Sequence, residues 1–193
     1  MGRLLALVAL LIAGLARAAE PGPGNLLVAA PHLRDPNFVH TVVLLVSHGG
    51  GTMGLVLNRP SRVSVAEALP DIAALAGRED PLYIGGPVAR GVVSVLARSA
   101  EALPKAREVI PGVWMSLSRE ALGAALARPE TPWRAYAGYA GWAPGQLEAE
   151  IARGDWRVVP ARAEDVFAAD PEGLWRRLAY GQWALAPAGA VRD

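Results

Sequence analysis

Runs of apolar and β-branched residues, separated by glycine, proline and charged residues, recur along the chain and predict a series of short strands. The longest run, residues 38–47, is apolar almost throughout, which predicts a central strand buried on both faces. Three glycines connect it to residues 52–57, and a link this short predicts an antiparallel hairpin. Shorter runs predict further strands at residues 25–29, 82–84, 92–96, 113–117, 133–142 and 156–160.

Helical spacing is limited to short segments of the chain. Ser64 and Glu67 have the spacing of a capping box, in which each side chain bonds the other residue's backbone N–H, and they predict a helix that ends near Pro70. Similar start signals predict three more helices, at Ser118, Pro144 and Asp170. Because the strands cluster with a few short helices instead of alternating with them, the pattern predicts a single α+β domain.

The first eighteen residues have the pattern of a signal peptide. Arg3 supplies a positive start, residues 4–15 form an apolar run, and Ala16-Arg17-Ala18 supplies the small residues of a cleavage site. The run is shorter than the roughly 20 residues of a transmembrane helix. We therefore predict a signal peptide over residues 1–18 and a domain over residues 19–193, periplasmic or secreted, without a membrane span after cleavage. A misassigned start codon or a buried N-terminal helix is the alternative, and it would leave the protein in the cytoplasm.

Cysteine is absent, and the charge is close to neutral. The first point excludes disulfides, a thiolate nucleophile, cysteine-bound zinc and a lipoprotein anchor. Loss of Arg3 and Arg17 with the signal peptide would lower the formal net charge from +1 to −1. A domain that binds nucleic acid normally has a basic excess, because neutralised phosphates supply most of its affinity. Nucleic acid is therefore not expected as a partner.

The glycines at positions 49, 51 and 54 match the spacing of a dinucleotide-binding motif. Such a motif must open a helix, whose N-terminal amides hold the pyrophosphate. Here the glycines lead into Leu55-Val56-Leu57, a run typical of a strand, and no lysine follows as in a phosphate-binding loop. The pattern therefore indicates a hairpin turn, and we predict no cofactor.

The three histidines, His32, His40 and His48, are eight residues apart and match no zinc-binding motif. Loops could nevertheless bring His32 and His48 to Asp35, and such a cluster would make the protein a hydrolase or a metal-dependent enzyme. Asp35 also precedes a proline, a common turn signal that needs no chemistry. Surface or capping roles for these residues remain the competing interpretation, and no bound metal is predicted.

Other catalytic arrangements have little support. Ser47 and His48 are adjacent on a predicted strand, so their side chains point to opposite faces unless a bulge intervenes. Glu148 and Glu150 are two positions apart on a predicted helix and do not share a face. The sequence therefore assigns no catalytic residue.

Arg59 is the most suggestive single side chain, because Asn58 and Pro60 hold its backbone in a turn. The planar guanidinium suits a carboxylate or a phosphate of a ligand. The alternative is a salt bridge within the chain, for which Glu148 is one candidate.

Residues 136–145 combine three aromatic residues with three glycines, and a helix is predicted to follow. Residues 136–151 resemble the signature of the bacterial YqgE/AlgH family. Segments elsewhere in the chain resemble the same family in the same order, at residues 27–38, 41–45, 54–60 and 83–88. The resemblance implies a compact α+β domain whose mostly antiparallel, bifurcated sheet curls into a pseudo-barrel with several short helices.

The resemblance leaves the activity open, because it supplies no agreed catalytic residues. The family name implies transcriptional regulation, so a transcriptional regulator acting in the cytoplasm is an alternative. No basic recognition helix is recognisable, however, and a signal peptide is atypical for the family.

We therefore expect a non-enzymatic binding or regulatory-accessory domain whose partner is a small ligand or a protein. Its site would combine the glycine- and aromatic-rich turns with the side chain of Arg59, whose backbone is held in a turn. The candidate ligand-binding residues are Asp35, His48, Asn58, Arg59, Gly85, Gly86, Tyr139, Trp142, Gln146 and Glu148.

Overall fold

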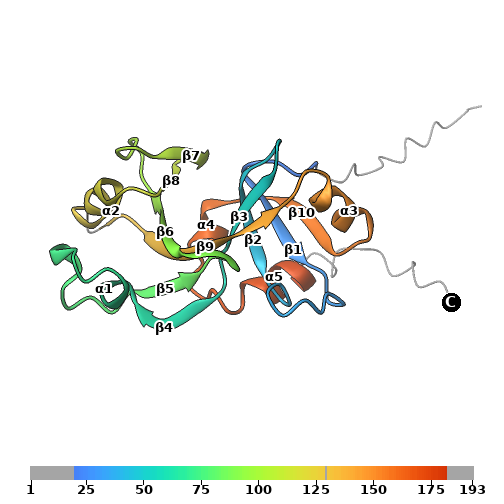
Figure 1. Cartoon of the computed structure of the whole chain (residues 1–193), viewed down its shortest axis with the longest axis horizontal. Coiled ribbons are helices and arrows are strands. Elements are labelled where there is room, and N and C mark those ends of the chain that lie inside the picture. Colours follow the sequence, from blue (N-terminus) through green and yellow to red (C-terminus); the bar gives the residue numbers. More distant parts are fainter. Residues whose placement is uncertain (1–19, 129, 182–193) are drawn as a thin grey trace, which may run out of the picture.

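One long strand, β9 (Trp133–Trp142), crosses the molecule and joins its two halves into one sheet (Figure 1). In this computed structural model, which describes residues 20–128 and 130–181, the first part of β9 lies between β6 (Val88–Arg98) and β5 (Pro81–Ile84). The last residues of β9 pair instead with β3 (Thr52–Val56). The sheet therefore forks at β9, and among the strand pairs of the described residues only β5–β9 is parallel. The predicted signal peptide lies outside the described residues.

The main path of the sheet has the strand order β10-β1-β2-β3-β9-β6-β8-β7, and β4 and β5 form its branch. The other strands are β1 (Asn25–Ala29), β2 (Val42–Ser47), β4 (Pro60–Ser64), β7 (Arg107–Ile110), β8 (Val113–Ser116) and β10 (Trp156–Pro160). The helices are α1 (Val65–Ala68), η1 (Ala73–Leu75), α2 (Arg119–Leu126), α3 (Gln146–Ala152), α4 (Ala163–Val166) and α5 (Leu174–Gly181).

The sheet curls until its last strand returns to the β2–β3 hairpin. Gly24, just before β1, lies so close to β7 that an added Cβ would meet the carbonyl oxygen of Val109 at 3.0 Å. Nη2 of Arg107 donates to the carbonyl oxygen of Val46 in β2, at 2.5 Å. We call this junction between β2 and β7 the seam. The α+β fold with a forked, curled sheet is therefore confirmed.

The core lies inside the curled sheet. All residues of β2 except Ser47 are buried, as expected for an apolar strand with neighbours on both sides. Next to it, Phe38 stacks on Trp142 with ring centroids 5.8 Å apart, and Trp156 meets both rings edge-on. Helix α5 covers β1, where Nε1 of Trp175 donates to the carbonyl oxygen of Ala29 at 2.8 Å.

Most predicted elements are confirmed. The last helix begins at Leu174 and not directly after an N-cap at Asp170, and two further elements need correction. The hairpin is present and the capping box forms as expected: Ser64 Oγ accepts from the Glu67 N–H, and the Glu67 carboxylate accepts from the Ser64 N–H. The strand predicted over residues 38–47 begins only at Val42. Residues 38–40 form turns because the carbonyl of Asp35 accepts from the N–H groups of residues 38 and 39.

The second correction concerns the helix predicted to have Pro144 in its first turn. Gly145 is the N-cap, with φ 78°, so Pro144 precedes the helix. The sequence also left four elements unpredicted, namely β4, η1, β7 and α4. These are three to five residues long, and neither β4 nor β7 is a continuous apolar run. Over the described residues, no helix has the length and apolar character needed to cross a bilayer.

Candidate functional site

Asn58 and Arg59 hold the loop that precedes β2. Asn58 is buried, and its amide bridges two backbone groups: Oδ1 accepts from the Val42 N–H, and Nδ2 donates to the His40 carbonyl, both at 2.9 Å. Arg59 Nη2 donates to the carbonyl oxygens of residues 36 and 39, both at 3.2 Å. These contacts give both side chains a role in the fold.

The charge on Arg59 is not neutralised by a salt bridge. No carboxylate of the described residues lies within 4.0 Å of its guanidinium, so the alternative of a salt bridge within the chain, with Glu148 as one candidate, is not found there. Burial lowers the pKa of Arg59, and the charge of nearby Asp35 opposes that shift. Asp35 uses its own carboxylate to accept from the Asn37 N–H at 2.7 Å, as its turn signal indicated.

Gly85 and Gly86 allow the link between β5 and β6 to pass closely over β9. A Cβ added at Gly85 would lie 2.3 Å from the carbonyl oxygen of Gly138, and one at Gly86 would lie 2.1 Å from the carbonyl carbon of Tyr139. Tyr139 itself is half-buried and packs against the main core. Close backbone packing therefore accounts for this glycine pair.

Trp142 and Gln146 both bind the carboxylate of Glu150, a residue that was not among the candidates. Oε2 of Glu150 accepts from the indole N–H groups of Trp142 and Trp156, each at 2.8 Å. Oε1 accepts from the Gln146 amide at 2.9 Å. The carboxylate of Glu150 therefore links the aromatic and glycine-rich segment to α3. The sequence could have suggested that an acidic side chain accepts from the two indole N–H groups, but not which acidic residue does so.

His48 connects the β2–β3 hairpin to α3. Its Nδ1 lies 2.8 Å from Thr52 Oγ1, and its Nε2 lies 3.4 Å from Glu148 Oε1. A hydroxyl, an imidazole and a carboxylate in this order have the connectivity of an activated nucleophile. Thr52 is only 7% exposed, however, so little of this residue faces solvent. The chain of contacts therefore fastens the hairpin to the helix.

The proposed cluster of His32, Asp35 and His48 does not form. His32 lies 3.7 Å from the Asp155 carboxylate, and His40 packs on Trp175 with ring centroids 4.0 Å apart. Within residues 20–128 and 130–181, no group of three or more histidine, aspartate or glutamate side chains is placed to hold a metal ion. The β-bulge that could have paired Ser47 with His48 does exist, between Leu45 and Ser47. His48 nonetheless bonds Thr52 and Glu148.

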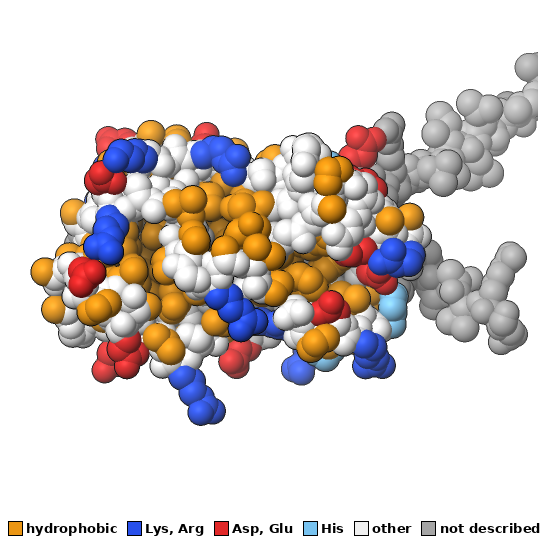
Figure 2. All heavy atoms as spheres, viewed as in Figure 1, with side chains coloured by type: hydrophobic (Ala, Val, Ile, Leu, Met, Phe, Trp, Pro, Cys, Tyr) orange, Lys and Arg blue, Asp and Glu red, His pale blue; other side chains and the backbone are white. Residues whose placement is uncertain are grey.

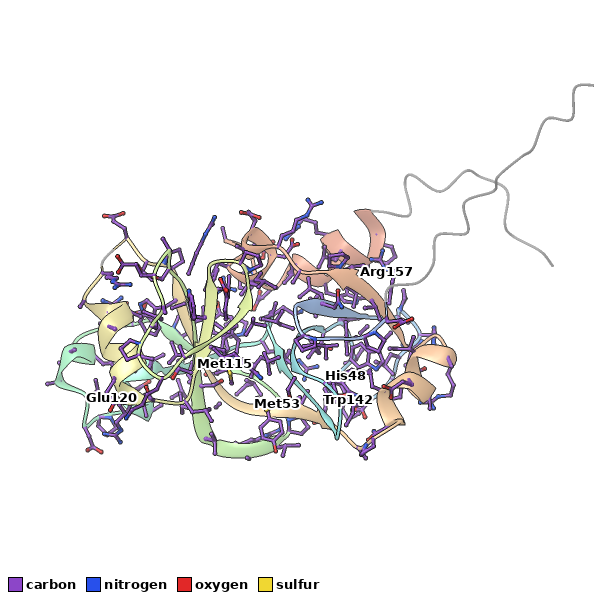
Figure 3. The ribbon with its side chains drawn as sticks, turned by 90° about the horizontal axis from the view of Figure 1, so that it is seen from above. His48, Met53, Met115, Glu120, Trp142 and Arg157 are labelled. Carbon is purple, nitrogen blue, oxygen red and sulfur yellow. The ribbon has the colours of Figure 1, made fainter. Side chains whose placement is uncertain are left out.

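A groove opens at the seam, and none of the ten candidate ligand-binding residues lines it. Its volume is about 580 Å³, and we call it the seam groove. The hairpin supplies Ser47 and Met53, while β7, β8 and their flanking residues form the opposite wall. Seen from above, Met53 and Met115 lie near the middle of the molecule, between Glu120 at one end and Trp142 toward α3 (Figure 3). The residues that line the seam groove are Ser47, Met53, Lys105, Ala106, Arg107, Met115, Ser116, Leu117 and Ser118.

A second hollow, of about 220 Å³, adjoins the seam groove and shares Leu117 and Ser118 with it. We call it the β6 pocket. Leu117 stands between the two hollows and is 62% exposed, and Val92 on the far wall is 45% exposed. Figure 2 shows hydrophobic side chains gathered across the middle of one face, over β6 and β9. The residues that line the β6 pocket are Leu69, Ile72, Gly91, Val92, Val93, Val95, Leu117, Ser118, Arg119 and Leu122.

The charged side chains in the walls of both hollows are cationic. They are Lys105 and Arg107 in the seam groove and Arg119 in the β6 pocket, and no acid lines either one. Sequence reasoning missed this surface because its residues come from strands far apart in the chain. Leu117 was also assigned to a strand, and nothing in its neighbours indicated that it would be exposed.

Comparison with known proteins places the chain among similar sequences over almost all of the described residues. Residues 26–182 match a protein-family model described as AlgH-like. A UPF0301 protein of Streptomyces coelicolor is 44% identical over 161 residues, which cover 80% of this chain and 83% of that protein. A UPF0301 protein of Myxococcus xanthus is 43% identical over 157 residues, which cover 79% of this chain and 86% of that protein.

Two solved structures have a similar fold. The crystal structure of a Corynebacterium diphtheriae protein superposes with a TM-score of 0.72 at 32% identity, covering 86% of this chain and 89% of that one. The solution structure of the AlgH protein from Pseudomonas aeruginosa superposes with a TM-score of 0.69 at 35% identity, covering 88% and 95%. These similarities agree with the forked, curled sheet described above.

Proposed function

This chain belongs to the AlgH-like family, and we propose that it is a non-enzymatic binding domain whose ligand lies in the seam groove. The observation that carries the proposal is the exposure of Leu117 between two apolar hollows. Contiguous exposed apolar surface with a polar rim is typical of a binding site in a soluble protein. A regulatory-accessory role would be exercised through this contact.

The contacts of the polar candidate residues support binding over catalysis. The polar groups of Asn58 and Gln146 are used in hydrogen bonds within the fold, and the carboxylate of Glu150 accepts three. The hydroxyl nearest to a histidine, that of Thr52, is buried. None of the ten candidates named from the sequence lines the seam groove or the β6 pocket. Ligand binding by these residues stays a prediction.

We further propose that the domain acts after export, in the periplasm or outside the cell. The support is the apolar run and cleavage pattern of residues 1–18. Because a signal peptide is atypical for the family, the support comes from this segment alone.

The dye 8-anilinonaphthalene-1-sulfonate tests the binding proposal, because it combines an apolar ring system with an anionic group. Its fluorescence should rise on mixing with the folded protein, and Leu117→Asp should remove most of that rise. Val63→Asp is the matched control, since Val63 is 46% exposed but lines neither hollow. Near-ultraviolet circular dichroism must show that each variant is folded, because loosely packed proteins also bind this dye. No dye binding, or equal binding by all three proteins, would reject the proposal.

A further inference from the structure

We infer that the natural occupant of the seam groove is an extended polypeptide segment of a partner protein, with apolar side chains and at least one carboxylate. The inference rests on the proposed function and adds the chemical class of the ligand. Three features of the surface carry it: the paired hollows, the open strand edges and the unneutralised charge of Arg107.

The paired hollows suit side chains that project from one continuous backbone. The seam groove and the β6 pocket lie on either side of Leu117 and are joined through it and Ser118. An extended segment places every second side chain on the same face, so it can fill two neighbouring hollows while its backbone passes over the residue between them. The floor contains Met53 and Met115, whose flexible thioethers adapt to apolar side chains of different shapes.

The seam also carries strand edges that are not fully paired. Among the strands of residues 20–128 and 130–181, β7 is the last of the sheet and has a strand neighbour on one side only. β1 pairs with β2 at residues 42–44 and the Leu45 carbonyl still accepts from the Gly24 N–H, whereas the Val46 carbonyl accepts from the side chain of Arg107. An unpaired strand edge is the feature to which extended peptides add in many complexes. A lipid or another small amphiphile would have no use for it.

The charge of the walls indicates a carboxylate on the occupant. Lys105 is paired with Glu120 at 2.7 Å, and Arg119 is paired with Asp71 at 3.7 Å. Arg107 has only the neutral carbonyl of Val46, and no carboxylate in the described ranges lies within 4.0 Å of it. An acidic side chain that enters the groove would therefore meet an arginine that has no other anion.

Three probes separate this inference from its rivals: a blocked peptide of alternating leucine and glutamate, the same peptide with lysine in place of glutamate, and dodecanoate. We expect the leucine–glutamate peptide to bind more tightly than the leucine–lysine peptide, by about fivefold at low salt, because an exposed ion pair is worth up to about 1 kcal/mol. Arg107→Gln should reduce that difference. Arg62→Gln is the matched control, since Arg62 is exposed and lines neither hollow.

Because Arg107 also bridges the seam, its substitution can disturb folding, and the salt dependence of the wild-type protein supplies a second measurement. The affinity for the leucine–glutamate peptide should fall as salt rises, and that for the leucine–lysine peptide should not. Equal affinity for both peptides, or binding of dodecanoate without either peptide, would overturn the inference while the dye result keeps the proposed function intact. If dye, peptides and dodecanoate all fail to bind, the proposed function fails with it.

Discussion

Three hydrogen bonds converge on the carboxylate of Glu150, two of them from indole groups whose side chains are almost fully buried. A buried N–H that loses its acceptor costs about 1–3 kcal/mol, so Glu150→Ala should lower the free energy of unfolding by about 2–4 kcal/mol. Glu148→Ala is the matched control on the same helix. It removes only a contact at 3.4 Å between His48 and a half-exposed carboxylate and should cost less than about 1 kcal/mol.

Urea unfolding followed by tryptophan fluorescence measures both variants. Equal losses for the two substitutions would mean that the indole–carboxylate contacts do not hold α3 against β9 and β10 as described.

At the scale of single residues, the sequence indicated that the segment around residues 139 and 142 was unusual, but it did not indicate the reason. The aromatic residues at positions 139 and 142 suggested a ligand, whereas Trp142 packs on Phe38 and donates to Glu150. Arg59 suggested a ligand or an ion pair, and its bonds go to backbone carbonyls. Residue types alone do not distinguish these outcomes, because the partner of a polar group depends on which loops meet in space.

At the scale of elements, the link between β5 and β6 passes so close to β9 that it requires glycine. A Cβ at Gly86 would meet backbone atoms of Tyr139 at 2.1–2.2 Å, and the backbone cannot move aside without disturbing the fork of the sheet. Gly86→Ala should therefore lower the free energy of unfolding by about 3 kcal/mol or more. Gly123→Ala, in α2, is the matched control, because a Cβ there has no neighbour within 4 Å.

Alanine is the better helix former, so Gly123→Ala should leave stability unchanged or raise it by about 1 kcal/mol. Thermal and urea unfolding of both variants provide the comparison. A Gly86→Ala protein as stable as the wild type would contradict the close packing at the fork.

Elements that are determined by residues close together in the sequence could be predicted from the sequence. The Ser64–Glu67 capping box and the strand over residues 133–142 were predicted correctly for this reason. β7 was missed because it is short and begins with Arg107 and Glu108, and it is a strand only because β8 pairs with it. The start of β2 was placed too early because the turn at Asp35 overrides the apolar run.

At the scale of the whole molecule, the proposal of export predicts that the mature chain begins at Ala19. Mass spectrometry of the protein from its native cell measures this mass directly, and cell fractionation shows where the processed form resides. Substituting Ala18 with a bulky residue should block processing, since the cleavage site requires small side chains. An intact N-terminus in the exported pool, or only full-length protein in the cytoplasm, would contradict export.

The curled sheet also explains why the proposed site could not be predicted from the sequence. The seam exists only because the sheet bends until β7 meets β2, which brings residues near 47 and 53 against residues 105–118. The family resemblance implied the curled sheet. The groove, however, depends on the gap that remains at the seam, where the curled sheet does not close completely. Resemblance and local patterns thus supplied the architecture, and the candidate surface came from long-range packing.

The most direct test of the central claim is to map the binding surface by NMR, from backbone amide shifts of the isotopically labelled domain titrated with 8-anilinonaphthalene-1-sulfonate. The account predicts saturable shifts in the walls of the seam groove, at residues 47, 53, 105–107 and 115–118, which extend across Leu117 to residues 92 and 93. Shifts centred instead on Asp35, Arg59 and Tyr139, or scattered over the surface without saturation, would contradict it.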